Sequence, residues 1–175
     1  MDKNDNWLNE PPAGTRPADL AFLALKDTFL AGDASGERLR LRYYHDCDQR
    51  VLIARVLFGV KAQGPPDHVH GGAQASLLDE TMGGIAWLSG YPVVAAQLNT
   101  TFRAMLPLTI RAEVHAEVKQ VEGRKVWTRG DIRDGNSGKV FTRAEALFVK
   151  LDEDHIARLS DKAQLIIEAM RRNGL

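Results

Sequence analysis

The segment from His70 to Asp79 contains the residue types best suited to chemistry. It opens with His-Gly-Gly and continues as an apolar, helix-forming run to about Ser89, interrupted by the acidic pair Asp79 and Glu80. Burying a carboxylate is costly unless something compensates it. Asp79 therefore either solvates a partly open helix face or acts, in a semi-dry cleft, as a general base or a nucleophile. Glu80 points about 100° away around the helix, and we expect it to face solvent or a second subunit.

Gly71 and Gly72 leave the first backbone N–H groups of this predicted helix unobstructed, and the helix dipole adds partial positive charge there. Such a helix start can stabilise a carbonyl oxygen that becomes negative during attack, although two glycines also suit a simple tight turn. Gly71 and Asp79 are separated by roughly 12 Å along one helix. One small electrophile cannot touch both within a chain, so a site that uses both predicts a two-fold symmetric dimer.

The remaining polar candidates give weaker signals. His68 and His70 lie on an irregular loop beside Asp67 without a third ligand, so no metal is predicted, and His70 is expected to orient the turn by hydrogen bonding. Cys47 has no base partner in the sequence and is expected to pack rather than react. The basic residues of the later strands fit a solvated sheet face or, for a subset, a cradle for the phosphates of a nucleotide-bearing substrate: Arg103, Arg124, Lys125, Arg129 and Lys139.

Hydrophobic periodicity and turn residues predict the elements around this helix. Residues 1–16 are polar and proline-rich, so a flexible N-terminus is expected, followed by a helix that begins at Pro17. Residues 152–175 are predicted to form an amphipathic C-terminal helix. The predicted strands are 39–43, 51–60, 93–105, 108–121, 124–133 and 139–151.

The central helix, at about residues 70–89, is apolar most of the way round, so it must be buried on most sides. Turn residues at 122–123 and 134–138 connect the later strands into an antiparallel run. An antiparallel sheet curled around one helix satisfies both observations. The sequence therefore predicts an α+β fold in a single domain over residues 17–151.

Composition limits the function classes. With 44% apolar and 26% charged residues the chain has the profile of a globular domain. The 23 basic and 23 acidic side chains cancel, so no global field attracts nucleic acid or an anionic membrane. A single cysteine excludes an intrachain disulfide. Since the first residues lack an apolar secretory segment, a cytoplasmic location is expected.

These motifs resemble the hotdog-fold acyl-CoA thioesterases of the phenylacetate-pathway (PaaI-like) type, in particular the branch that contains thioesterase superfamily members 4 and 5. The resemblance rests first on the segment from His70 to Asp79 with the preceding Gly-Pro-Pro, and it covers roughly residues 50 to 151. Supporting matches are the segments 97–103, 121–125 and 144–150.

The resemblance implies a hotdog fold that works as a homodimer or a dimer of dimers. It implies that Asp79 is the catalytic carboxylate, that the Gly71 N–H polarises the thioester carbonyl, and that His70 shapes the turn. It further implies that Gly71 and Asp79 of one site come from opposite protomers, and that no metal or organic cofactor is needed. The residues expected to bind substrate are Gly72, Gln97, Thr100, Arg103, Arg124 and Lys125.

The sequence departs from the family's pattern in two places. Relatives often carry a hydroxyl residue early in the strand after the helix, where this chain has Ala95, and some have Asn before the His-Gly-Gly step, where this chain has Gln63 and Gly64. Gln97 and Thr100 are the candidates to replace the lost hydroxyl. These departures keep open a non-catalytic, acyl-CoA-binding hotdog protein.

Two further alternatives are a hydratase, whose Asp–His pair Asp67 and His70 imitate poorly, and a purely partner-binding role. The type and length of the acyl group do not follow from the sequence.

Overall fold

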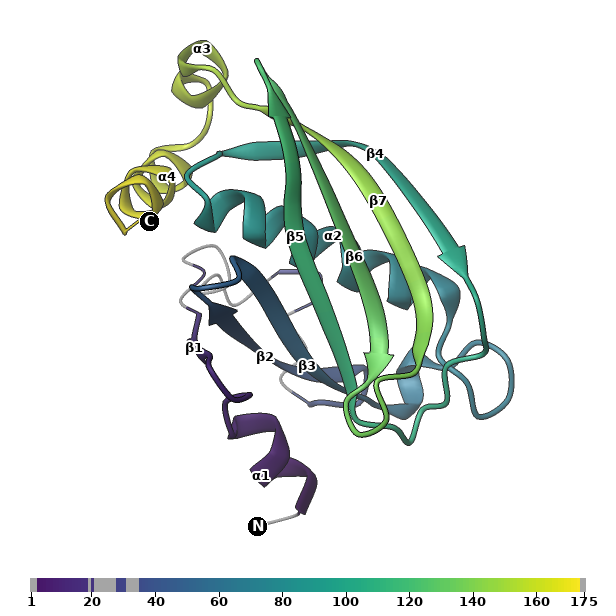
Figure 1. Ribbon diagram of the computed structural model, residues 1–175. Helices are drawn as coiled ribbons and strands as arrows, with labels where there is room; N and C mark the ends of the chain where they lie inside the picture. The colour runs from purple at the N-terminus through teal and green to yellow at the C-terminus, as the bar shows by residue number, and fades with distance from the viewer. Residues whose placement is uncertain (1–2, 19, 21–27, 31–34, 174–175) are drawn as a thin grey trace.

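The computed structural model describes residues 3–18, 20, 28–30 and 35–173, and it confirms the α+β prediction. An antiparallel sheet curls around one long helix, α2 (Gly71–Leu88), as Figure 1 shows. In the described part of the chain the strands lie in the order β1-β2-β3-β5-β6-β7-β4. Their bounds are β1 (Arg16–Pro17), β2 (Leu39–Asp46), β3 (Val51–Phe58), β4 (Val93–Phe102), β5 (Ala112–Glu122), β6 (Lys125–Asp134) and β7 (Val140–Lys150).

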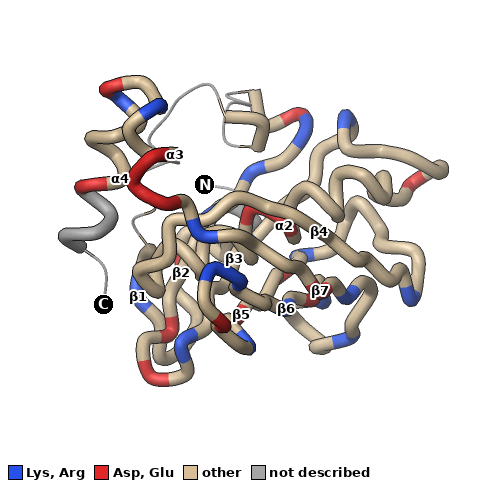
Figure 2. The backbone as a smooth tube through the Cα atoms, turned by 90° about the horizontal axis from the view of Figure 1, so that it is seen from above, with Lys and Arg blue, Asp and Glu red and all other residues tan. Residues whose placement is uncertain are grey.

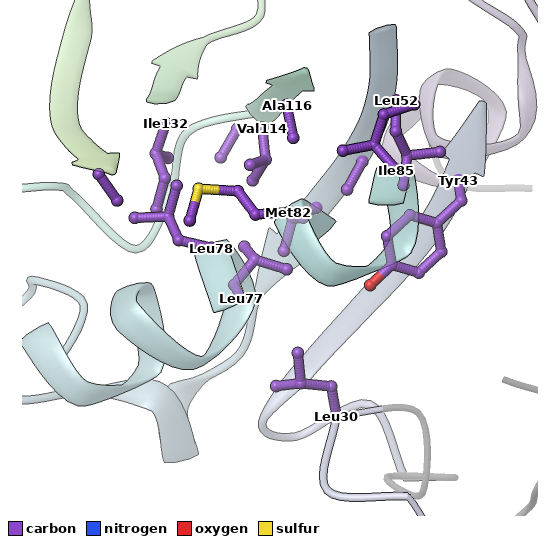
Figure 3. Close-up of a cluster of buried hydrophobic side chains, with 14 of the residues drawn as sticks. Leu30, Tyr43, Leu52, Leu77, Leu78, Met82, Ile85, Val114, Ala116 and Ile132 are labelled. Carbon is purple, nitrogen blue, oxygen red and sulfur yellow. The ribbon is translucent and has the colours of Figure 1, made fainter. Parts of the chain in front are cut away.

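Helix α2 is buried because its apolar side chains fill the concave face of the sheet. Leu77, Leu78, Met82 and Ile85 point toward side chains of β2, β3, β5 and β6 (Figure 3). Each fully buried aliphatic side chain of this size contributes about 1.5–3 kcal/mol. The helix approaches β6 at Gly130, where an added Cβ would lie 3.1 Å from the Met82 side chain.

The alternation predicted for the strand after residue 108 is confirmed in β5. Ala112, Val114 and Ala116 are buried against the core, whereas the residues between them are only half-buried. The hairpin between β5 and β6 turns at Gly123, whose φ is 54°. A left-handed φ of this kind favours glycine, so the predicted turn at residues 122–123 is confirmed.

Strand β4 is the last strand of the sheet order, with β7 as its single neighbour in the described residues. Most of its side chains are exposed on both faces, including Val94 at 51% and Phe102 at 52%. A long edge strand with exposed apolar side chains can pair with another strand. The pairing of β4 with β7 is irregular between Ala95 and Gln97, and such bulges often lie next to active sites.

Part of the N-terminal segment that we expected to be flexible is helical. Helix α1 (Lys3–Asn9) forms there, and its Trp7 and Leu8 are buried with Leu57. The Trp7 ring lies 4.7 Å from the Arg55 guanidinium and 5.7 Å from that of Arg111, contacts that stabilise a cation over an aromatic face.

The helix predicted to begin at Pro17 is not found at its start. Pro17 belongs to strand β1 and pairs with Tyr44, because proline suits an edge strand as well as a first helical turn. Residues 19, 21–27 and 31–34, which include most of that predicted helix, lie outside the described residues.

The C-terminal helix predicted over residues 152–175 is two helices, α3 (Glu153–Ala157) and α4 (Asp161–Asn173). The Asp152 carboxylate caps α3 by accepting a hydrogen bond from the His155 N–H at 2.9 Å. The Ser160 hydroxyl accepts one from the Ala163 N–H at 3.3 Å. A second cap within an amphipathic run starts a second helix. The prediction of one continuous C-terminal helix is therefore wrong.

Candidate active site

The start of α2 is fixed by His70, as predicted. The Nδ1 atom of His70 accepts a hydrogen bond from the Gly72 N–H at 2.9 Å, so His70 is the N-cap of the helix. The first N–H groups of a helix have no partner within the helix. Gly72 gives its N–H to the cap, whereas the N–H groups of Gly71 and Ala73 have no partner among the described residues.

A buried glutamine, which sequence reasoning missed, fixes the same turn to the sheet. The Gln74 side chain donates to the Val69 carbonyl at 3.1 Å and accepts a hydrogen bond from the Thr142 hydroxyl of β7. A polar side chain on the core face of an apolar helix was the available signal, because buried amides are nearly always hydrogen-bonded.

The end of β4 lies against the first residue of α2. A Cβ added to Gly71 would lie 3.2 Å from Cζ of Phe102, so a larger residue at this position requires the exposed Phe102 ring to shift slightly. The exposed Phe102 ring and the open Gly71 N–H therefore lie together at this end of the helix.

Asp79 lies further along α2, in a different environment. Its Oδ1 atom is buried and has no hydrogen-bond partner among the described residues. Burial raises the pKa of this carboxyl above its usual value of 3.8. An unsatisfied buried oxygen costs about 1–3 kcal/mol, and more when it is charged, so this position is poor for stability and suited to a reactive carboxylate.

The Asp79 cavity has a volume of about 240 Å³. Apart from Asp79 and Glu80, the residues that line it are glycines or have apolar side chains. This apolar lining desolvates the Asp79 carboxylate. The other lining residues are Gly83, Gly84, Trp87, Val93, Ala95, Phe148 and Ile166. Ala95, where the family resemblance led us to expect a hydroxyl residue, lines the same cavity as Asp79 but can donate no side-chain hydrogen bond.

Glu80, which we expected to face solvent or a second subunit, is half-buried and hydrogen-bonded within the chain. Its carboxylate accepts a hydrogen bond from the Tyr43 hydroxyl at 2.8 Å. Burial raises the pKa of Glu80, the Tyr43 hydrogen bond opposes this, and the Asp79 charge adds to it. Burial, and then Glu80, also raises the pKa of Tyr43. The rotation of about 100° relative to Asp79 brings the Glu80 carboxylate to the Tyr43 hydroxyl of β2.

The structure places Gly71 and Asp79 at opposite ends of β4. Gly71 lies beside Phe102 at the end of the strand, whereas Asp79 shares a cavity with Val93 and Ala95 at its beginning. Within one chain the two predicted catalytic groups are therefore not brought together, in agreement with their separation along the helix.

The expected substrate-binding residues are also spread over the sheet. Gln97 and Arg103 are exposed, and Thr100 is half-buried. Arg124 and Lys125 lie at the β5–β6 hairpin, beside the β7 end that pairs with Val93 rather than with Phe102. Arg124 donates to the Lys150 carbonyl and pairs with Asp152 at 3.3 Å.

The weaker candidates have local partners. His68 Nδ1 lies 2.7 Å from the Pro66 carbonyl, and no group of three metal-ligating side chains occurs within the described ranges. Cys47 corrects the expectation of no base partner, since its sulfur lies 3.4 Å from His45 Nδ1. Among the helices that the structure describes, none is long and apolar enough to span a membrane.

Comparison with known proteins gives a consistent picture. Residues 67–141 match the family described as the Thioesterase superfamily. The acyl-coenzyme A thioesterase THEM4 of Rattus norvegicus is 35% identical over 114 residues, which cover 64% of this chain and 48% of that protein. The chain spans about half the length of the curated relatives it matches.

Solved structures support the same relationship. A thioesterase superfamily protein, RHA08564, superimposes with a TM-score of 0.60 at 34% identity, covering 63% of this chain and 53% of that one. Zebrafish thioesterase superfamily member 2 does so with a TM-score of 0.61 at 16% identity, covering 74% and 93%. These similarities confirm the predicted hotdog fold and the resemblance to its thioesterases.

Proposed function

Because residues 67–141 match the thioesterase superfamily, we propose that this chain hydrolyses an acyl-coenzyme A to a free acid and coenzyme A. The observation that carries the proposal is the buried, unpaired Oδ1 of Asp79 in an apolar cavity. A carboxylate with a raised pKa and no structural partner is suited to accept a proton or to attack a carbonyl.

As a general base, Asp79 takes a proton from a water molecule whose oxygen attacks the thioester carbonyl carbon. The negative charge that develops on the carbonyl oxygen is stabilised by the Gly71 N–H and by the dipole of α2. When the C–S bond breaks, the thiolate of coenzyme A leaves and receives the proton from Asp79. Direct attack by the carboxylate, followed by hydrolysis of the mixed anhydride, uses the same two groups.

The two groups meet when two copies of the chain pair along β4. Antiparallel pairing about a two-fold axis through the middle of this edge strand sets the Val93 end of one copy beside the Phe102 end of the other. The Asp79 cavity of one protomer then faces the partner's Gly71. The exposure of β4 on both faces and its open edge support this pairing.

The same pairing gathers the expected phosphate-binding residues. Arg103, which follows Phe102, is carried toward the strand end where the other protomer has Arg124 and Lys125. Cations that lie apart in one chain thereby surround one side of a shared site. Arginine and lysine in such a cluster suit the phosphates of coenzyme A.

A pair of inactive variants tests the shared site. Asp79→Asn removes the base. Gly71→Pro removes the donor, and proline is well tolerated at the first position of a helix. Each variant alone should lower kcat/KM at least ~100-fold. Refolding them together should restore about a quarter of wild-type activity, since half the dimers are mixed and each holds one intact site.

The control variant is Gly71→Ala, which adds the same contact with Phe102 but keeps the N–H. It should retain most of the activity. If the mixture stays inactive while both variants form dimers in sedimentation velocity, the site is not shared. Wild-type turnover by Asp79→Asn on every acyl-CoA would contradict the catalytic assignment.

The position of Ala95 in the Asp79 cavity supports a second candidate, a protein that binds acyl-CoA without cleaving it. This candidate predicts acyl-CoA binding by calorimetry together with no release of free thiol in a thiol-capture assay. Hydrolysis by the wild-type protein that depends on Asp79 eliminates it.

A further inference from the structure

The Asp79 cavity is completed by the C-terminal part of the chain. Ile166 of α4 lines it together with Trp87 of α2, Val93 of β4 and Phe148 of β7. We propose that α4 forms the end wall of the acyl-binding cavity and that Ile166 limits the length of the acyl group. This inference rests on the proposed function, because it assigns the substrate class of the same site.

Helix α4 contacts the domain along a narrow apolar stripe. Ile167 is buried and Ile166 is half-buried, whereas the neighbouring Leu165 is 64% exposed. Ile166 therefore faces the cavity while Leu165 faces away from the domain. Replacing either side chain changes the surface of α4 without opening the main core, so both variants should fold.

The two C-terminal helices are joined to each other and to the sheet at a few points. The Gln164 side chain donates to the carbonyls of Ala157 and Leu159, which ties α4 to the end of α3. At the other end of α3, Asp152 pairs with Arg124 of the β5–β6 hairpin. Figure 2 shows the acidic α3 close to basic positions of the sheet. The Arg124–Asp152 ion pair is thus one contact between the sheet and the start of α3.

The chemistry of the cavity specifies the acyl group. The Trp87 indole N–H donates to the Val93 carbonyl at 3.2 Å, so its ring offers an apolar surface to a ligand. Asp79 and Glu80 repel a second carboxylate. The volume of about 240 Å³ is below the roughly 300–1,000 Å³ of typical ligand pockets. An uncharged acyl group of short to medium length fits these walls, and a dicarboxylic acyl group does not.

The test is a series of straight-chain acyl-CoAs from acetyl to palmitoyl, with succinyl-CoA included, assayed by thiol capture. Ile166→Ala should raise kcat/KM for the longer members relative to the shorter ones by ~10-fold, because a few buried carbons are worth this much in a hydrophobic pocket. Ile166→Trp should shift the preference toward shorter chains. The matched control, Leu165→Ala, should leave the wild-type profile unchanged.

Binding of the same series to Asp79→Asn protein, measured by calorimetry, separates this inference from the catalytic proposal. If no acyl-CoA is hydrolysed but Ile166→Ala still shifts the binding profile toward longer chains, the catalytic proposal fails and the end wall stands. The inference is overturned if Ile166→Ala and Leu165→Ala give the same profile, if succinyl-CoA is preferred, or if no acyl-CoA binds.

Discussion

The start of α2 and the turn that carries Asp79 are both polar sites on an otherwise apolar helix, but their hydrogen bonding differs. At the start, His70 accepts from the Gly72 N–H, and the Gln74 side chain bonds to Val69 and Thr142. Further along, the Oδ1 atom of Asp79 is buried without a partner among the described residues. The polar side chains of the first site are hydrogen-bonded, whereas the carboxylate of the second site has a buried oxygen without a partner in the described part of the chain.

The difference separates groups that hold the fold from groups available for chemistry. A satisfied buried network fixes geometry, and here it fixes the direction in which the Gly71 N–H points. An unsatisfied buried carboxylate weakens the fold, and proteins keep such costs mainly at functional sites. Glu80, which follows Asp79 on the same helix, shows the same difference, because its carboxylate is hydrogen-bonded to Tyr43.

The largest expected change in stability comes from the satisfied site. Gln74→Ala leaves the Val69 carbonyl and the Thr142 hydroxyl without their buried partner, so the free energy of unfolding should fall by about 1–3 kcal/mol. Urea denaturation at fixed protein concentration measures this. Gln74→Met combined with Thr142→Val should recover part of the loss, because replacing both partners by apolar groups is less costly than orphaning one. No loss in the single variant would show that the network is not structural.

Replacing the unsatisfied Asp79 carboxylate should raise the free energy of unfolding, whereas Gln74→Ala lowers it. Burial raises the pKa of Asp79 above 3.8, so the folded state binds its proton more tightly than the unfolded state does. The contribution of Asp79 to the stability of the wild type therefore falls as pH rises from its unfolded-state pKa through its folded-state pKa. The asparagine of Asp79→Asn does not titrate and carries no charge. At pH 7 this variant should therefore be more stable than wild type by roughly 1 kcal/mol.

The sign of this difference can be checked by urea denaturation of both proteins between pH 3 and pH 8. The advantage of Asp79→Asn should shrink as pH falls toward 3.8, the usual value for this carboxyl. Glu80 is present in both proteins and is a constant background except for its interaction with Asp79. A variant less stable than wild type at pH 7 would mean that the Asp79 carboxylate is a structural group.

Much of this contrast could be predicted from the sequence, because it depends on local patterns. The His-Gly-Gly step and the apolar run located α2 and its cap, and alternation with turn residues located the strands from β4 to β7. The separation of Gly71 from Asp79 follows from helix geometry alone. All of these features lie within one element or between neighbouring elements.

The missed features depend on contacts between distant segments. The Tyr43 hydroxyl and Glu80 are 37 residues apart and meet because the sheet curls. Trp7 is buried because Arg55 and Arg111 lie beside its ring, which a polar N-terminal sequence does not indicate. Ile166 lines the Asp79 cavity from α4, which the caps at Asp152 and Ser160 separate from α3.

The smallest expected effect concerns the cap itself. His70→Ala removes the acceptor for the Gly72 N–H, and loss of an N-cap costs about 0.5–2 kcal/mol, with an exposed cap at the low end. The matched control is His68→Ala, which lies on the same loop but bonds to the Pro66 carbonyl instead. Because an uncapped helix start holds the Gly71 N–H less rigidly, His70→Ala should lower kcat more than it raises KM. Equal effects of the two histidine variants on kcat would show that the cap does not position the carbonyl-binding N–H.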